Sequence, residues 1–153
     1  MSQRLDHFTA APDLFQPMLE QEKLFKDSGL EHNLVELVKL RASQINGCAY
    51  CLHMHSQDLR AHGETEDRMQ LLNAWRDSSL YSPRERAALA WTECLTRVET
   101  SGAPNEDYEK VAQHFSAREQ ITLTLLIGAI NSWNRIAIGF HAEHPASKEA
   151  NAA

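Results

Sequence analysis

Glycine and proline are scarce in this 153-residue chain, with six and five copies. Both residues interrupt regular structure, and most of them stand between stretches of helical periodicity, so their scarcity favours helices joined by short turns. Basic residues are also few: the chain has fifteen basic and twenty-one acidic residues, its net charge is −6, and no basic run occurs. These values do not fit a nucleic-acid-binding or anionic-membrane-binding surface. A small molecule or a protein is the expected partner.

Long apolar runs are absent as well. The longest uncharged stretch outside the cysteine region, residues 120–134, is too short and too polar to span a bilayer. The N-terminal sequence MSQRLDHFTAAPD contains no apolar core of a signal peptide. We therefore expect no membrane segment and a cytoplasmic location.

Cysteine is rare, with three copies in the chain. An odd number does not make a disulfide framework, and in a reducing compartment a close pair is more often catalytic or metal-binding than structural. Cys94 shares an apolar helical face with Trp91 and Leu95, so we expect it to pack in the core.

Helical periodicity is abundant. Apolar residues recur at helical spacing in seven segments, which predict helices over roughly 13–28, 33–46, 48–63, 65–76, 83–98, 106–114 and 116–140. Ser82 with Glu85, and Ser116 with Glu119, have the spacing of capping boxes that open two of these helices. Gly47 suits a helix end.

The chain length fits one domain with a sizeable core. We predict an all-α bundle of about six to seven helices over residues 1–144, followed by a disordered tail at 145–153. The apolar surface of the last helix is wide enough to suggest burial on several sides, in the bundle or between subunits.

Two cysteines and a histidine fall on one face of the helix predicted at 48–63. Cys48, Cys51 and His55 lie in the same sector of a helical wheel, together with His62. Cys51 and His55 are four residues apart, so one helical turn separates their side chains. The helix start also favours a thiolate, because unpaired backbone N–H groups lie there. The spacing permits a redox dithiol in which one thiol resolves the other.

Other interpretations of these residues remain open. Cys48, Cys51 and His55 also suit zinc, although a closed site needs a fourth ligand, for which His62 and Glu36 are candidates. The two thiols can alternatively be small apolar groups of a helical core.

Two charged residues of the preceding helix have unusual positions. Glu36 falls roughly opposite the apolar stripe, and periodicity alone predicts that it faces solvent. Arg41 falls on the apolar stripe, so it requires a buried or intersubunit carboxylate.

The order of these residues resembles a family signature. Glu36, eleven residues, Cys48, two residues, Cys51, three residues and His55 resemble the motif of the AhpD-like alkylhydroperoxidases in the carboxymuconolactone decarboxylase family. The motif covers residues 36–55. The resemblance extends more loosely over about 30–140, where it includes SPRERAALAWTE and NSWNRIAIGF.

The resemblance implies a thiol-dependent peroxidase or disulfide reductase that reduces hydroperoxides in antioxidant defence. It implies a peroxidatic Cys51, a resolving Cys48 and a proton relay through His55 assisted by Glu36. No bound cofactor is expected, but an external dithiol must restore the pair, supplied by a lipoyl-type or thioredoxin-type protein. The AhpD prototype has a histidine between its cysteines, where this chain has Tyr50.

The resemblance also implies an all-helical homo-oligomer, built from dimers into trimers or hexamers. Two further functions within the family stay open. The decarboxylase branch acts on a lactone without needing the dithiol, and other members are non-redox proteins of the stress response that act through interactions.

Overall fold

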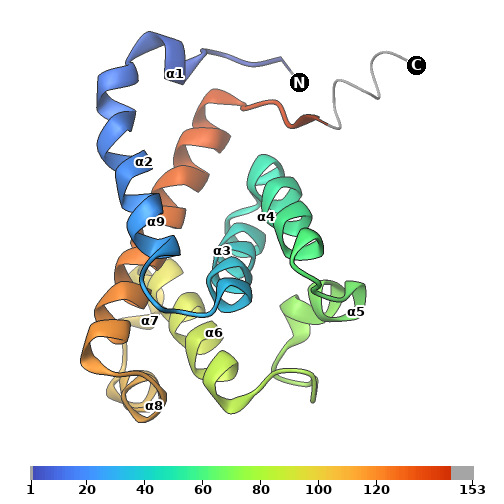
Figure 1. Ribbon diagram of the computed structural model, residues 1–153, viewed down its shortest axis with the longest axis vertical. Coiled ribbons are helices and arrows are strands. Elements are labelled where there is room, and N and C mark those ends of the chain that lie inside the picture. The colour runs from blue at the N-terminus through green and yellow to red at the C-terminus, as the bar shows by residue number, and fades with distance from the viewer. Residues whose placement is uncertain (1, 146–153) are drawn as a thin grey trace.

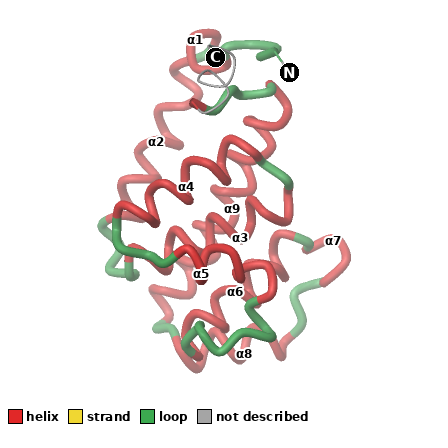
Figure 2. Tube along the Cα trace, turned by 90° about the vertical axis from the view of Figure 1, so that its right-hand side faces the viewer, coloured by secondary structure: helices red, strands yellow, loops and turns green. Residues whose placement is uncertain are grey.

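The computed structural model describes residues 2–145, which contain helices and no strand (Figures 1 and 2). The helices are α1 (His7–Ala10), α2 (Pro12–Lys26), α3 (His32–Asn46), α4 (Ala49–Ala61), α5 (Glu66–Gln70), the 3₁₀ helix η1 (Leu71–Ala74), α6 (Pro83–Thr96), α7 (Val98–Ser101), α8 (Asn105–His114) and α9 (Ala117–Phe140). The predicted all-α class is confirmed. The predicted disordered tail at 145–153 lies, except for its first residue, outside the described residues.

Each of the seven predicted helices has a counterpart, and the segment predicted at 65–76 forms α5 followed by η1. The capping boxes at the starts of α6 and α9 are both formed. Gly47 ends α3 with a φ of 71°, in the left-handed region that favours glycine. The single-turn helices α1 and α7 were not predicted, because four residues show too little periodicity.

Helix α3 lies at the centre of the fold, in contact with α4, α6 and α9. All residues from 34 to 43 are buried, so α3 has no solvent-facing side over that length. Leu34 and Val38 belong to one hydrophobic cluster, and Leu37 and Leu40 belong to a second. The remaining face of α3 is polar.

The two clusters occupy different sides of α3. The first joins α3 to α6, α8 and α9, and the second joins it to α4, η1 and α6. Their largest fully buried side chains include Leu37, Leu59, Leu72, Leu89, Leu123, Leu126 and Ile127. Burial of this apolar area is the main stabilising contribution to the bundle.

Helix α9 runs along the bundle and contacts α2, α3, α4, α6 and α8 (Figure 1). By length and composition it is also apolar enough to cross a membrane. Its inner face packs into the hydrophobic core and carries the buried amides of Asn131 and Asn134. The inner face of α9 is therefore part of the core of the bundle.

The carboxylate that Arg41 requires lies in the same chain. Arg41 Nε donates to Glu93 Oε1 of α6 at 2.8 Å, and Trp75 Nε1 donates to the same oxygen at 2.8 Å. Arg76 pairs with the other carboxylate oxygen. Burial raises the pKa of Glu93, but these hydrogen bonds outweigh it and lower the pKa. Glu93 therefore joins α3, α6 and the end of η1.

We predict that Glu93→Ala lowers the free energy of unfolding by about 3 kcal/mol, because it leaves the Arg41 guanidinium unpaired in a buried position. Urea unfolding followed by circular dichroism measures this loss. The matched control is Glu106→Ala, which removes an exposed ion pair with Lys110. Equal unfolding midpoints for the two variants would show that the Glu93 pairings contribute no more than a surface contact.

Candidate functional site

The two cysteines lie at the turn from α3 to α4. Cys48 is the N-cap of α4, and its Sγ accepts a hydrogen bond from the Cys51 backbone N–H at 3.3 Å. The two residues are joined by a disulfide, with their Cα atoms 5.4 Å apart. Their exposed fractions are 1% for Cys48 and 2% for Cys51. The helix start thus holds both sulfur atoms inside the protein.

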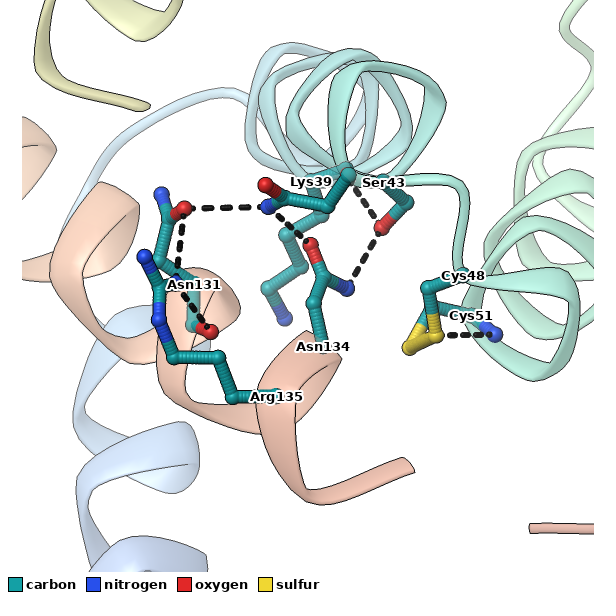
Figure 3. The surroundings of a disulfide bond; sticks show 8 residues. Lys39, Ser43, Cys48, Cys51, Asn131, Asn134 and Arg135 are labelled. Carbon is teal, nitrogen blue, oxygen red and sulfur yellow. Dashed lines mark hydrogen bonds between the residues drawn. A yellow bond between two sulfur atoms is a disulfide. The ribbon is translucent and has the colours of Figure 1, made fainter. Parts of the chain in front are cut away.

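A network of amides attaches this turn to α9. The side-chain NH₂ of Asn46 donates to Asn131 Oδ1 at 3.0 Å and to Asn134 Oδ1 at 2.8 Å. Asn134 donates in turn to Ser43 Oγ at 3.0 Å, and Figure 3 shows its side chain pointing toward Ser43 beside the disulfide. The Cys48 backbone N–H donates to the Ser43 carbonyl at 3.1 Å. The position of the dithiol is therefore fixed by three helices.

His55 lies one turn beyond Cys51 and forms a hydrogen bond with Glu36. The distance from His55 Nδ1 to Glu36 Oε2 is 2.6 Å, and the exposed fractions of the two residues are 4% and 3%. An ionised carboxylate can only accept, so Nδ1 carries the proton. His55 Nε2 is buried and has no hydrogen-bond partner within residues 2–145. In the neutral ring this nitrogen is free to accept a proton.

The prediction from periodicity that Glu36 faces solvent is wrong. It assumed that α3 has one buried face, whereas α4, α6 and α9 enclose the helix. Glu36 occupies the polar face with Lys39 and Ser43, at helical spacings of three and four residues. This face is directed at the site.

Charged groups continue beyond Glu36 on α3 and α2, and a tryptophan of α9 bonds to the last of them. Lys39 Nζ lies 3.3 Å from Glu36 Oε1 and 2.7 Å from Glu22 Oε2 on α2. Trp133 Nε1 on α9 donates to the other oxygen of Glu22 at 3.0 Å. Each buried charge thus has an opposite neighbour, as burial requires.

These neighbours set the ionisation of the pair. Burial raises the pKa of Glu36, but the hydrogen bond and charge of His55 and the charge of Lys39 outweigh it and lower the pKa to about 2. Burial lowers the pKa of Lys39, while the charges of Glu36 and Glu22 outweigh it and raise that pKa above its usual range. Both groups are therefore ionised at neutral pH.

A cavity of about 720 Å³ opens beside these groups. Cys51, His55, Glu36 and Lys39 line it, whereas Cys48 does not. Its apolar wall consists of Phe8, Leu19, Met54, Ile130, Trp133, Ile136 and Ala137. Cys51 and His55 therefore both border the cavity, although the Nε2 atom of His55 is itself buried.

The structure brings together all four residues that the motif selected, and their chemical roles stay predictions. His62, which the wheel placed in the same sector, is instead exposed at the C-cap of α4. Cys94 is buried in the first hydrophobic cluster. In the disulfide form the sulfur atoms of Cys48 and Cys51 offer no thiolate to a metal.

Three contributors to the site were not predicted from the sequence. Lys39 had a local signal, because it follows Glu36 by three residues and falls on the same helical face. Trp133 lies in the segment NSWNRIAIGF that resembles the family, but it was not selected as a site residue. Glu22 had no signal, since it comes from α2 and meets α3 only in the folded chain.

Comparisons with known proteins agree with this arrangement. The model of the carboxymuconolactone decarboxylase family matches residues 12–93. The uncharacterised protein YdfG of Bacillus subtilis is 43% identical over 138 residues, which cover 90% of this chain and 94% of YdfG.

Solved structures show the same fold. A protein of unknown function from Agrobacterium tumefaciens, named as a candidate AhpD antioxidant defence protein, has 42% identity and a TM-score of 0.91 over 94% of this chain and 99% of its own. A peroxidase-related protein from Ralstonia eutropha, named as an alkylhydroperoxidase AhpD core, has a TM-score of 0.77 over 90% of this chain and 73% of its own. At 21% identity, the second likeness concerns the fold alone.

We predict that Glu36 makes stability depend on pH in the acid range. Because its pKa is lowered from 4.5 to about 2 in the folded chain, its stabilisation is complete above pH 4.5 and is lost as the pH falls through 2. At 1.36 kcal/mol per pKa unit, the loss is about 3 kcal/mol. Urea unfolding between pH 6 and pH 2 should show this decrease in the free energy of unfolding for the parent protein. The decrease with falling pH should be smaller for Glu36→Gln.

The matched control is Glu109→Gln, an exposed glutamate of α8. It should keep the slope of the parent protein. Equal slopes for Glu36→Gln and Glu109→Gln would contradict the assignment.

Proposed function

Because the chain belongs to the carboxymuconolactone decarboxylase family and is AhpD-like, we propose that it is a thiol peroxidase that reduces hydroperoxides in antioxidant defence. One observation carries the proposal. Cys51 is already bonded to Cys48 and lines the same cavity as His55, whose Nδ1 is hydrogen-bonded to the buried carboxylate of Glu36.

The proposed cycle begins with activation of reduced Cys51. The Glu36 carboxylate holds the proton of His55 on Nδ1, which leaves Nε2 as the base for the thiol one helical turn away. The start of α4 adds stabilisation, because the positive end of a helix favours a thiolate; the Cys51 backbone N–H donates to Cys48 Sγ. Lys39 is a positioning residue that keeps Glu36 ionised.

Two covalent steps follow. The Cys51 thiolate attacks the terminal oxygen of the hydroperoxide, the O–O bond breaks, and the alkoxide leaves as the alcohol with the proton from His55. Cys51 becomes a sulfenic acid. The Cys48 thiol then attacks the Cys51 sulfur, the hydroxyl leaves as water, and the disulfide forms. One hydroperoxide and two thiols thus give an alcohol, water and a disulfide.

The geometry supports Cys51 as the attacking residue. It lines the cavity, and it precedes His55 by one helical turn. Cys48 lies behind it as the N-cap, where its sulfur already accepts the Cys51 N–H. A resolving thiol needs contact with Cys51 and not with the substrate.

The cavity wall favours an organic hydroperoxide over hydrogen peroxide. Aromatic and aliphatic side chains from α1, α2, α4 and α9 form most of this wall. An alkyl or aryl group gains free energy by burial against them, while the small peroxide leaves that surface uncovered.

The reductant in this proposal is a dithiol on a slender arm, such as a lipoyl group. Both sulfur atoms are at most 2% exposed, so reduction proceeds through the cavity. A lipoyl arm can enter it, whereas a thioredoxin must bring its whole active-site face to the sulfur. The disulfide then opens by exchange with the entering thiolate.

The proposal includes a cytoplasmic homo-oligomer. Large apolar side chains remain on the outside of α9 and α2, among them Ile121 at 63%, Leu125 at 50% and Leu24 at 70% exposure. Such side chains favour contacts with further copies of the chain. A reducing cytoplasm supplies the electrons that return the disulfide to the dithiol.

We predict that one equivalent of cumene hydroperoxide converts the reduced protein to a form lighter by two hydrogen atoms, with Cys94 still a free thiol. Cys48→Ser should instead gain one oxygen atom on Cys51, because no resolving thiol is left. Cys51→Ser should react about a hundredfold more slowly, as expected for a thiol without an activating base. Intact mass and thiol counting measure all three results.

The control for these cysteine variants is Cys94→Ser, which should behave as the parent protein. A sulfenic acid on Cys48 in the Cys51→Ser protein, with Cys48→Ser inert, would reverse the two roles. Unchanged thiols in the parent protein would refute the peroxidase and leave the decarboxylase or interaction role, for which the Cys48→Ser/Cys51→Ser protein should stay functional.

We further predict that dihydrolipoamide reduces the disulfide at least about tenfold faster than thioredoxin at equal concentration, because entry to Cys51 limits the exchange. Release of free thiols over time, measured with a chromogenic thiol reagent, gives both rates. The Cys48→Ser/Cys51→Ser protein corrects for background. Equal rates would show that the sulfur atoms are open to a protein surface.

A further inference from the structure

Three metal-ligating side chains meet at the outer edge of the α3–α4 pair. His32 is the first residue of α3, Asp58 lies in the last turn of α4, and His62 is the C-cap of α4. Their ligand atoms all lie within 4.8 Å of one another. The two helices lie side by side in Figure 1, with the end of α4 leading toward α5. This cluster is separate from the dithiol, which lies at the opposite end of α4.

The carboxylate of Asp58 lies close to both imidazoles. His32 Nε2 is 3.5 Å from Oδ2, and His62 Nδ1 is 3.4 Å from Oδ1. The ring centroids of His32 and His62 are 3.7 Å apart. Each histidine thus approaches a different oxygen of the same carboxylate.

The two nitrogen–oxygen separations are close to the edge of a tetrahedral zinc site. Zinc binds histidine nitrogen and carboxylate oxygen at roughly 2.0–2.2 Å, so adjacent ligands of a tetrahedral ion are about 3.4 Å apart. Hydrogen bonds between the same atoms would be shorter, at about 2.7–3.2 Å. These two distances are therefore longer than hydrogen bonds and compatible with ligands of a common ion.

Two of the three ligand groups have no competing partner. His32 Nε2 has no hydrogen-bond partner within residues 2–145, although it is buried from water. No lysine or arginine of the described chain pairs with the Asp58 carboxylate. His62 Nδ1 also lies 2.8 Å from the Asp58 carbonyl, a contact that metal binding through this nitrogen would replace. The side chains are 35%, 37% and 48% exposed for His32, Asp58 and His62, so an ion can enter from solvent.

We propose that His32, Asp58 and His62 bind one divalent transition-metal ion, with zinc favoured by the donor set. Three protein ligands leave the fourth position to water. The ion would connect the start of α3 to the end of α4, the two helices that carry Glu36 and His55. Asp58 also lines the cavity, so the ion would lie at the cavity rim. The site does not depend on the peroxidase proposal.

The test uses the full chain without an affinity tag, in its disulfide form, after removal of metals with a chelator. Titration with Co²⁺ should produce visible absorption bands of a four-coordinate ion that saturate at one equivalent per chain, and Zn²⁺ should displace them. His32→Gln and His62→Gln should each weaken Zn²⁺ binding by about tenfold or more in calorimetry.

The matched control is His114→Gln, which removes an exposed histidine from the last turn of α8. It should bind Zn²⁺ as the parent protein does, and so should the Cys48→Ser/Cys51→Ser protein. Circular dichroism checks that each variant is folded, and Asp58→Asn replaces any histidine variant that is not. Parent-like affinity in the folded variants at positions 32, 58 and 62 would overturn the proposal. Loss of binding in the double cysteine variant alone would also overturn the proposal, because the site would then depend on the cysteine pair.

Discussion

The hydrogen bond between the Glu36 carboxylate and the imidazole of His55 attaches the polar face of α3 to the inner face of α4. Both groups are almost fully buried, so breaking the bond would leave the Glu36 carboxylate without water and with Lys39 as its remaining partner. Lys39 and Glu22 are present for the same reason, because each ion of the series neutralises the next. The disulfide lies one helical turn from His55, so Cys51 borders the same cavity as these charged groups.

Features that depend on neighbouring residues could be predicted from the sequence. The caps of α6 and α9 were recognisable because a serine and a glutamate three residues apart satisfy the first N–H groups locally. The wheel correctly placed Cys51 and His55 on one inward face. It failed for His62, because α4 ends at Ala61 and the next residue leaves the helical path.

Features that depend on distant segments could not be predicted. The partner of Arg41 lies 52 residues away on α6, and nothing near Arg41 indicates it. Glu36 was placed in solvent because a helix with a single apolar stripe is the usual case, whereas α3 is enclosed by two hydrophobic clusters and a polar interior. The family resemblance assigned Glu36 to the site, whereas periodicity placed it in solvent. A family motif reflects which residues meet in the folded chain, and periodicity reflects a single helix.

The N-terminal segment closes one side of the cavity and is attached to the far end of the chain. The Arg4 backbone N–H donates to the Phe140 carbonyl at 2.9 Å, and its side chain donates to the Gly139 carbonyl at 3.0 Å. The groups proposed to react, by contrast, all come from α3, α4 and the turn between them. The two ends of the chain can therefore accumulate substitutions that alter which molecules are admitted, while the buried sulfur chemistry stays the same. Substrate choice and reactivity are thus separate targets for natural selection in this fold.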